Sequence, residues 1–384
     1  MTDHTMKKNP VSIPHTVWYA DDIRRGEREA ADALGLTLYE LMLRAGEAAF
    51  LVCRTAYPDA RHWLVLCGHG NNGGDGYVVA RLAKAVGIEV TLLAQESDKP
   101  LPEEAALARE AWLNAGGEIH ASNIVWPESV DLIVDALLGT GLQQAPRESI
   151  SQLIDHANSH PAPIVAVDIP SGLLAETGAT PGAVINADHT ITFIALKPGL
   201  LTGKARDVTG QLHFDSLGLD SWLAGQETKI QRFSAEQLSH WLKPRRPTSH
   251  KGDHGRVVII GGDHGTAGAI RMTGEAALRA GAGLVRVLTR SENIAPLLTA
   301  RPELMVHELT MDSLTESLEW ADVLVIGPGL GQQEWGKKAL QKVENFRKPM
   351  LWDADALNLL AINPDKRHNR VITPHPGEAA RLLG

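Results

Sequence analysis

The chain has 384 residues, of which 43% are hydrophobic, and a formal net charge of -9. This composition predicts a folded protein of about two or three domains, and the acidic balance offers no basic surface for nucleic acid or anionic lipid. Cys53 and Cys67 are too few for a disulfide framework, and no stretch reaches the roughly 20 apolar residues that span a bilayer. The first residues carry charges but no apolar signal-peptide core. We therefore expect a cytoplasmic protein with no nucleic-acid or membrane partner.

The first half of the chain alternates short apolar strands with amphipathic helices. Apolar residues at helical spacing predict a helical region over residues 17–56 and helices over 102–115 and 147–159. Continuous apolar runs predict strands within 63–67, 88–94, 131–141, 163–172 and 189–199. Strands of this kind suit a parallel sheet that helices cover on both faces. The predicted fold class is therefore doubly wound α/β.

The pattern breaks near residues 217–246, where the sequence becomes polar, charged and rich in proline. We place a domain boundary near residue 228, which gives domains over 1–228 and 229–384. Alternation then restarts, with strands expected within 256–262, 284–289 and 321–331 and a helix over 267–281. The segments 349–360 and 370–383 continue it. Both halves share the order of strand, glycine loop and helix, so we predict two separate α/β domains and no tandem array.

Residues 63–85 read WLVLCGHGNNGGDGYVVARLAKA, a strand that passes through a glycine-rich loop into a helix. Gly68, Gly70 and Gly73 fit the dinucleotide spacing G-x-G-x-x-G, which is weak evidence taken alone. The strand before it and the helix after it strengthen the interpretation, because backbone N–H groups at a helix N-terminus bind phosphate. The five residues that follow Gly70 place side-chain oxygens and flexible backbone in one turn: Asn71, Asn72, Gly73, Gly74 and Asp75.

Two further loops follow predicted strands and should meet the first one. Ligands of open α/β sheets gather at the carboxyl ends of the strands, and Asp135 and Asp168 stand at two such ends. Either aspartate alone would more often cap a turn or helix, but together, beside glycine-rich loops, they favour a pocket. Ser171 would face the same pocket. Lys197 is a further candidate, with a solvated lysine as its alternative.

At these residues the sequence resembles known families. GHGNNGGDGYVVARLA, VDALLGTGL, VDIPSGL and ALKPGL resemble the N-terminal domain of the YjeF family, the NAD(P)H-hydrate epimerases, over residues 17–225. HKGDHGRVVIIGG, HGTAGA, GPGLG, DADALN and TPHPGE resemble the ADP- or ATP-dependent NAD(P)H-hydrate dehydratases. The order of the halves is that of the fused bifunctional repair enzymes. The resemblance implies a Rossmann-like epimerase domain followed by part of a ribokinase-like domain.

The resemblance also implies a small-molecule substrate, NADH or NADPH hydrated at C6 of the nicotinamide ring, whose R and S forms the first domain interconverts. Asp168 would be the acid–base residue. Asn72, Asp135 and Ser171 would hold a potassium ion, since oxygen ligands with one carboxylate suit a weakly demanding cation. The substrate site would comprise Asp168 together with Asn71, Asn72, Gly73, Gly74, Asp75, Gly139, Thr140, Gly141, Leu142, Gln143, Gln144 and Ala145.

In the second domain the resemblance assigns Ala267, Gly329 and His375 to the hydrate substrate and implies ADP or ATP as co-substrate. A plain turn at Gly329 and a structural histidine at 375 are the alternatives. Asp353 and Asp355 could bind solvent or metal. The loop from Lys251 to Gly255 has two interpretations. It either faces an anion or the neighbouring domain, or it is a solvated linker.

The second half lacks the later GxGD-type motif that carries the catalytic aspartate of these dehydratases, and the chain ends at Gly384. We therefore expect a fragment of a longer protein in which only the epimerase site is complete. A small-molecule kinase and a non-catalytic nucleotide-binding scaffold are the alternatives. The absent aspartate counts against the kinase. The intact NNGGD loop and Asp168 count against the scaffold. Preference between the two coenzymes or between the two nucleotides stays open, and a homo-oligomer is allowed.

Overall fold

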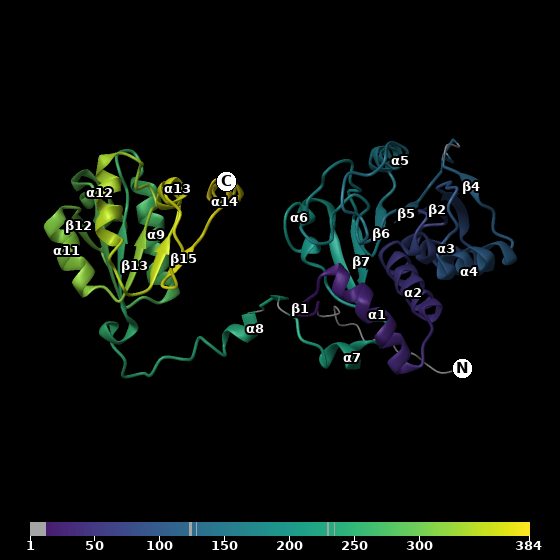
Figure 1. Ribbon diagram of the computed structural model, residues 1–384, viewed down its shortest axis with the longest axis horizontal. Coiled ribbons are helices and arrows are strands. Elements are labelled where there is room, and N and C mark those ends of the chain that lie inside the picture. The colour runs from purple at the N-terminus through teal and green to yellow at the C-terminus, as the bar shows by residue number, and fades with distance from the viewer. Residues whose placement is uncertain (1–12, 123–124, 128, 229, 234) are drawn as a thin grey trace. The chain divides into compact units, whose positions relative to one another are not determined.

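The computed structural model describes residues 13–122, 125–127, 129–228, 230–233 and 235–384. The chain divides into two compact units between Leu242 and Lys243 (Figure 1). Strand β1 (Thr16–Val17) pairs antiparallel with β9 (Ile230–Gln231), so the first unit includes residues beyond 228. The boundary near residue 228 stays a prediction about where the two family domains part.

The first unit is built on a parallel sheet that, within the described residues, has seven strands in the order β4-β3-β2-β5-β6-β7-β8. The strands are β2 (His62–Cys67), β3 (Glu89–Ala94), β4 (His120–Ala121), β5 (Leu132–Ala136), β6 (Ile164–Val167), β7 (His189–Phe193) and β8 (Gln211–Asp215). Strand order reverses between β2 and β5, and a crevice forms at such a switch point. The predicted doubly wound α/β class is confirmed.

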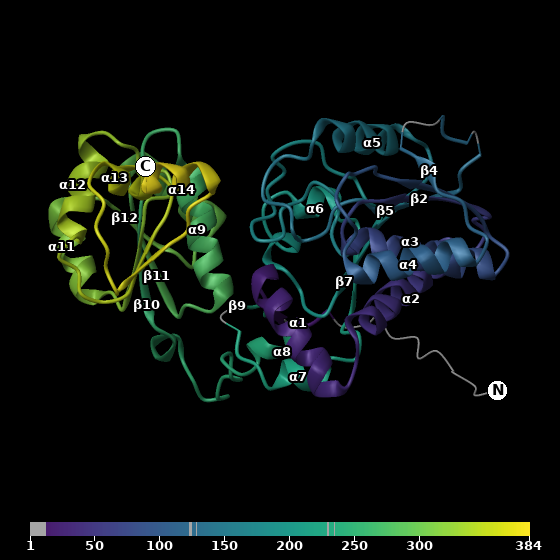
Figure 2. The same ribbon diagram turned by 45° about the vertical axis from the view of Figure 1, so that its right-hand side comes forward.

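Helices cover both faces of this sheet. They are α1 (Ala20–Leu34), α2 (Leu38–Ala56), α3 (Asn71–Ala85), α4 (Glu103–Asn114) and α5 (Glu148–Ser159), followed by the short η1 (Pro198–Leu200), α6 (Ala205–Val208), α7 (Asp220–Ala224) and α8 (Ala235–Leu238). Figure 2 shows α2, α3 and α4 on one face and α5 on the other. One apolar core lies under α2 to α4, and a second, containing Leu153 and Ile154, lies under α5.

The helical region expected over residues 17–56 is interrupted in the structure. Gly35 ends α1 in the left-handed conformation with φ 66°, which glycine adopts without steric cost. Thr37 then begins α2 with a capping box, because its side chain accepts from the Glu40 N–H and Glu40 accepts from the Thr37 N–H. The helical prediction is confirmed over Ala20–Leu34 and Leu38–Ala56, and the glycine and threonine form a cap-to-cap junction between the two helices.

The glycine-rich segment is also placed differently from the expectation. Gly70 is the N-cap of α3, so residues 71–75 form its first turns and are not a loop. A Cβ on Gly73 would clash with the carbonyl oxygen of Gly68, and one on Gly68 with that of Leu137. These glycines allow β2, α3 and the segment after β5 to approach closely, which is the packing role of such a motif.

The second unit repeats the same strand order. Its parallel sheet, in the part of the chain that is described, runs β12-β11-β10-β13-β14-β15. Its strands are β10 (Arg256–Ile260), β11 (Leu284–Thr289), β12 (Met305–Glu308), β13 (Val323–Ile326), β14 (Met350–Trp352) and β15 (Arg370–Ile372). Its helices are η2 (Lys251–His254), α9 (Ala267–Ala280), η3 (Ser291–Asn293), α10 (Ile294–Ala300), α11 (Met311–Trp320), α12 (Glu334–Val343), α13 (Asp355–Ile362) and α14 (Pro376–Leu383).

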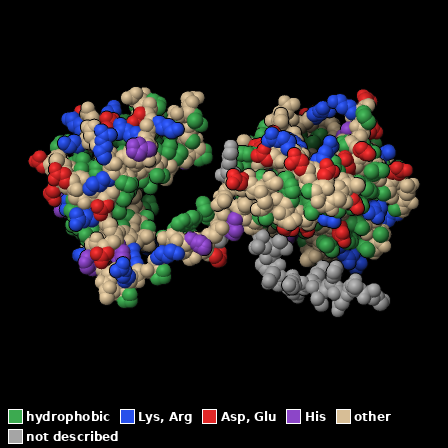
Figure 3. All heavy atoms as spheres, turned by 60° about the horizontal axis from the view of Figure 1, so that its bottom comes forward, with side chains coloured by type: hydrophobic (Ala, Val, Ile, Leu, Met, Phe, Trp, Pro, Cys, Tyr) green, Lys and Arg blue, Asp and Glu red, His purple; other side chains and the backbone are tan. Residues whose placement is uncertain are grey.

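Both faces of this second sheet are covered as well. One apolar core draws on α11, α12 and α13, and the other on α9 and α10. On the face drawn in Figure 3, acidic and basic side chains are interspersed on each unit. None of the helices in the described residues is both long and apolar enough to cross a membrane.

Candidate active site

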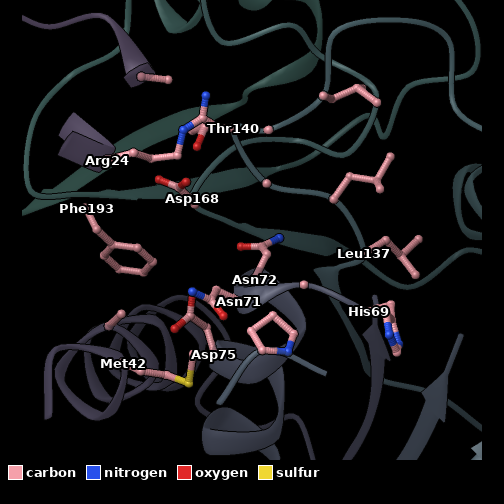
Figure 4. Close-up of a pocket in the computed structure, with 18 of the residues that line it drawn as sticks. Arg24, Met42, His69, Asn71, Asn72, Asp75, Leu137, Thr140, Asp168 and Phe193 are labelled. Carbon is pink, nitrogen blue, oxygen red and sulfur yellow. The ribbon is translucent and has the colours of Figure 1, made fainter. Parts of the chain in front are cut away.

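A cavity of about 1050 Å³ opens at the carboxyl ends of the first unit's strands, beside the switch point between β2 and β5. Its walls come from α1 and α2, the start of α3, residues 137–147 after β5, and the residues that follow β6 and β7. Figure 4 shows Asp168 on one side and Asp75 and Asn71 on the other, with Asn72 and Phe193 between them in this view. This volume accommodates a nucleotide-sized ligand.

Asp168 follows β6 and forms a buried ion pair. Its Oδ1 accepts from Lys197 Nζ at 2.6 Å, and Lys197 Nζ also donates to Thr192 Oγ1 at 2.8 Å and to the Phe193 carbonyl at 2.9 Å. Lys197 is only 3% exposed, so the alternative of a solvated lysine is wrong. Its ammonium is fixed by three oxygens in a pocket wall.

The backbone of Asp168 is strained. Its φ is 64°, a left-handed conformation that costs a non-glycine residue on the order of 1 kcal/mol or more. Its N–H donates to the Ile191 carbonyl at 2.7 Å, which fixes the residue against β7. Strain of this kind at a pocket wall favours a functional interpretation, because the conformation directs the carboxylate to Lys197 and the cavity.

Besides Asp168 and Glu104, two carboxyl groups line the cavity, and burial acts on both. Burial first, then the charges of Asp168 and Glu27, raises the pKa of Asp75 well above the usual range, and Lys197 offsets part of this rise. Burial also raises the pKa of Glu27 on α1, with the charges of Asp168 and Glu104 adding to it and Lys197 opposing it. The cavity therefore favours a bound proton on these carboxyls.

Asp135, at the end of β5, is completely buried and bound to Ser171. Its Oδ1 accepts from Ser171 Oγ at 2.6 Å and its Oδ2 from Ser171 N–H at 2.8 Å. Burial raises the pKa of Asp135 to about 6, although these hydrogen bonds lower it. Ser171 Oγ in turn accepts from the Leu138 N–H at 2.8 Å, so the network fixes the start of the segment after β5.

Asn72 is buried at the start of α3, and neither its Oδ1 nor its Nδ2 has a hydrogen-bond partner. A Cβ added to Gly139 would lie 3.3 Å from the Asn72 Cβ, so the amide lies beside the segment that Ser171 fixes. An unpartnered buried amide costs free energy unless a ligand or ion completes it. Among the described residues there is no group of three or more His, Cys, Asp or Glu side chains that could hold a metal.

Most of the predicted substrate residues line this cavity. They are Asn71, Asn72, Asp75, Gly139, Thr140, Gly141, Leu142, Gln143, Gln144, Ala145 and Asp168. Gly73 and Gly74 instead lie beneath it, packed against Gly68 and against Met42 and Ala105.

Residues of the first helices also line the cavity, and the sequence interpretation missed them. Arg24 and Glu27 come from α1 and Met42 from α2. A Cβ on Gly141 would lie 3.5 Å from Arg24 Nη1, so α1 reaches the segment after β5. The charged residues of α1 were a weak indication of a cavity wall, because a polar helix face is usually solvated.

In the second unit, the structure brings Ala267 and Gly329 together but not His375. Thr266, just before Ala267, donates its Oγ1 to the Gly329 carbonyl at 2.9 Å, and Gly329 has φ 60°. His375 follows β15, two strands along the same sheet edge. Its Nδ1 accepts from the Gly377 N–H at 3.0 Å, which caps α14.

The other candidates of the second unit have structural partners. Asp355 Oδ2 accepts from the Gly331 N–H at 2.8 Å and so fixes the glycine-rich turn after β13. Lys251 begins η2, and a Cβ on Gly283 would clash with its carbonyl oxygen, so this loop packs on the start of β11. Asp353 follows β14, and its carbonyl oxygen lies against Gly327.

Comparisons with known proteins agree with this two-unit architecture. A family described as YjeF-related protein N-terminus matches residues 38–199, and one described as NAD(P)H-hydrate dehydratase matches residues 257–384. The chain is 98% identical over 384 residues to the bifunctional NAD(P)H-hydrate repair enzyme of Escherichia coli strain K12, covering 100% of this chain and 75% of that protein. It is 47% identical over 403 residues to the Leishmania braziliensis enzyme of that name, covering 96% and 72%.

A solved ADP/ATP-dependent NAD(P)H-hydrate dehydratase from Bacillus subtilis, co-crystallized with ATP/Mg²⁺, is 28% identical with a TM-score of 0.34, covering 39% of this chain and 54% of that one. The family assignment rests on the sequence matches, since the relatives are well above 30% identical and are covered over more than two thirds of their length. The chain belongs to the family of bifunctional NAD(P)H-hydrate repair enzymes.

Proposed function

We propose that the cavity of the first unit interconverts the R and S hydrates of NADH and NADPH and that the second unit serves their ADP- or ATP-dependent dehydration. Family membership supports this repair function over a small-molecule kinase or a non-catalytic scaffold. The observation that carries the epimerase site is the buried Asp168–Lys197 pair on the wall of a nucleotide-sized cavity.

Epimerisation at C6 requires a C–O bond to break and re-form on the other face of the ring. The lone pair of the ring nitrogen expels the hydroxyl as water once it is protonated, which leaves an iminium, and water then adds with loss of a proton. A carboxyl group that gives or takes this proton contributes about 10²–10⁴-fold. Asp168 is our candidate for it, and Lys197, with Thr192 as its second contact, is a positioning residue.

The start of α3 and the segment 139–145 are the proposed contacts for the rest of the substrate. The N-terminus of the 15-residue helix α3 presents its free N–H groups and positive dipole end to the cavity at Gly70 and Asn71. Gly70 has open space where a Cβ would be. The pyrophosphate of a dinucleotide fits this end.

The residues around Asn72 fit a potassium ion. Its unpartnered Oδ1 is a buried oxygen donor, and the Asp135–Ser171 pair supplies a carboxylate and a hydroxyl beside the same segment after β5. Oxygen donors with a single carboxylate suit a monovalent cation better than zinc or copper. When bound, the ion would supply positive charge near the substrate, and Asn72, Asp135 and Ser171 would hold it.

For the second unit we propose Ala267, Gly329 and His375 as contacts of the hydrate. The turn at Gly329 and the start of α9 lie at the carboxyl end of the sheet, where such ligands bind. His375 Nε2 lies 3.4 Å from Glu378 Oε1, so its ring is oriented by the cap it forms. ADP or ATP is the proposed co-substrate of the repair reaction.

The epimerase assignment is tested by giving the chain the pure R or S hydrate and following the other epimer by chromatography. Asp168→Asn should slow exchange by at least about 10²-fold, while Glu47→Gln, an exposed carboxyl of α2 outside the cavity, should not. No acceleration by the unaltered chain, or full activity of Asp168→Asn with this substrate, contradicts the proposal.

A further inference from the structure

Inversion of the configuration at C6 needs proton transfer on both faces of the nicotinamide ring, which one carboxyl group does not provide. The hydroxyl departs from one face of the ring and water arrives on the other, so a proton must be given on one side and taken on the opposite side. This reasoning rests on the proposed epimerase function. It requires a second acid–base group across the cavity from Asp168.

Asp75 occupies such a position. It lies one turn into α3, at the β2 side of the switch point, whereas Asp168 follows β6 on the other side of β5. Both line the cavity, and Figure 4 shows them on different sides of it with Phe193 and Asn72 between them in the view. Among the described residues, Lys197 forms an ion pair with Asp168 and not with Asp75, so the two carboxyls differ in their partners.

We propose that Asp75 is the second catalytic acid–base residue and that Asp75 and Asp168 serve opposite faces of C6. In one direction Asp75 gives its proton to the departing hydroxyl, the C–O bond breaks, and water is released as the ring nitrogen forms the iminium. A new water adds to the other face, and Asp168 takes its proton. The reverse reaction uses each group in the other role. After each forward turnover Asp168 releases its proton to solvent water and Asp75 takes one up, which restores the starting state, so the cycle consumes nothing.

The charges around Asp75 support this starting state. Burial and the negative charges of Asp168 and Glu27 raise the pKa of Asp75, which favours its protonated form, while Lys197 on the β7 side opposes this. The Cys67 thiol at the end of β2 is buried and its pKa is raised as well, so it adds no thiolate charge near neutral pH. Asp75 therefore favours its protonated form, whereas Asp168 is paired with the Lys197 ammonium.

Glu27 is the competing candidate, because it lines the same cavity and its pKa is also raised. It comes from α1, which reaches the segment after β5 at Gly141. A carboxyl on α1 is held by helix docking, whereas Asp75 belongs to the helix that starts at the sheet edge. We assign the proton transfer to Asp75, and Glu27→Gln tests the alternative.

The experiment uses pure R and pure S hydrate in oxygen-18 water with the full chain. Each reaction is followed both for epimer formation and for label entering the unconverted epimer. With Asp75→Asn, epimerisation should fall by about 10²-fold or more, while Asp168 can still expel the hydroxyl of one epimer and return water to the same face. That variant should therefore exchange label in only one epimer, and Asp168→Asn should exchange it in only the other.

The remaining variants separate catalysis from folding. Asp75→Glu keeps a carboxyl and should recover part of the epimerisation, and Glu47→Gln should match the unaltered chain. Three outcomes overturn the proposal. In the first, Asp75→Asn epimerises at the normal rate, and in the second, Asp75→Asn and Asp168→Asn exchange label in the same epimer. In the third, Glu27→Gln loses epimerisation and exchanges label in one epimer, as expected for Asp75→Asn. Loss of label exchange from both epimers in Asp75→Asn with an unchanged melting temperature also overturns it. If the unaltered chain itself accelerates neither process, the proposed function fails instead.

Discussion

Replacing Lys197 with methionine should loosen the first unit locally. The substitution keeps the length of the side chain but removes an ammonium that Asp168, Thr192 and the Phe193 carbonyl all contact within 2.9 Å. Removing one partner of a buried ion pair costs about 3–5 kcal/mol. Asp168 retains 16% side-chain exposure toward the cavity, so we expect the low end, about 3 kcal/mol or roughly a 150-fold change in the opening equilibrium.

A double-mutant cycle isolates the pair from the rest of the effect. Asp168→Asn alone leaves the buried ammonium without its counter-charge and should also destabilise. The combination Lys197→Met with Asp168→Asn removes both charges and should cost about 2 kcal/mol less than the sum of the single changes. Because the chain has two units, one global unfolding curve is not a two-state measurement. Amide hydrogen exchange in β6 and β7 gives the local value.

The result that refutes this reasoning is specific. If Lys197→Met leaves exchange in β6 and β7 within about threefold of the unaltered chain, the ammonium is screened by water and does not bind Asp168 strongly. A coupling near zero with two large single effects would instead mean that each side chain acts through packing alone. The matched control is Lys204→Met, an exposed lysine of the same segment, which should change little.

Three further predictions concern the same unit. Burial raises the pKa of Asp135 to about 6 in the folded state, against about 4 when unfolded, so the folded state binds more protons between these values. The stability of the first unit should therefore fall by about 3 kcal/mol in total as pH rises from about 3 to about 7, then level off; amide hydrogen exchange in β5 should show this, and Asp135→Asn should abolish it. Potassium should raise the melting temperature more than a large organic cation at equal ionic strength, and Asn72→Ala should remove the difference. Gly73→Ala should destabilise by about 1–3 kcal/mol because its Cβ meets the Gly68 carbonyl, whereas Gly70→Ala should be nearly neutral; equal melting temperatures for the two would contradict the packing role.

The meeting of strand ends is the part of the site that follows from sequence. Asp135 and Ser171 end consecutive strands, β5 and β6, and parallel neighbours bring such residues to one edge. The rule predicts that they meet, and their 2.6 Å hydrogen bond confirms it, although both side chains are fully buried and neither lines the cavity. The position of Lys197 does not follow from this rule, because a lysine after a strand is usually solvated. Only the fold brings its ammonium into contact with Thr192 and Asp168.

The role of α1 could not be derived in this way. Glu27 reaches the cavity because α1 docks across the sheet edge, where Ala20 N–H donates to Glu176 Oε1 at 2.8 Å. That contact joins residues 156 positions apart, and local patterning carries no information about it. The glycine motif located the cavity correctly, but the expected reason was close approach of a ligand. In the structure, Gly68 and Gly73 allow close packing of the backbone.

The two units show that the shared fold does not determine the chemistry of the edge. Both sheets reverse their strand order beside the first strand, and both place glycine turns there. In the second unit, Asp263 is bound to Arg290 at 2.7 Å and Asp355 to the Gly331 N–H, so these carboxylates orient turns. In the first unit, Asp75 lines a cavity, and burial raises its pKa. The same cavity is lined by Asp168, which Lys197 binds. Carboxyl groups that face a ligand therefore lie at the first edge, which is why we place the epimerisation chemistry there.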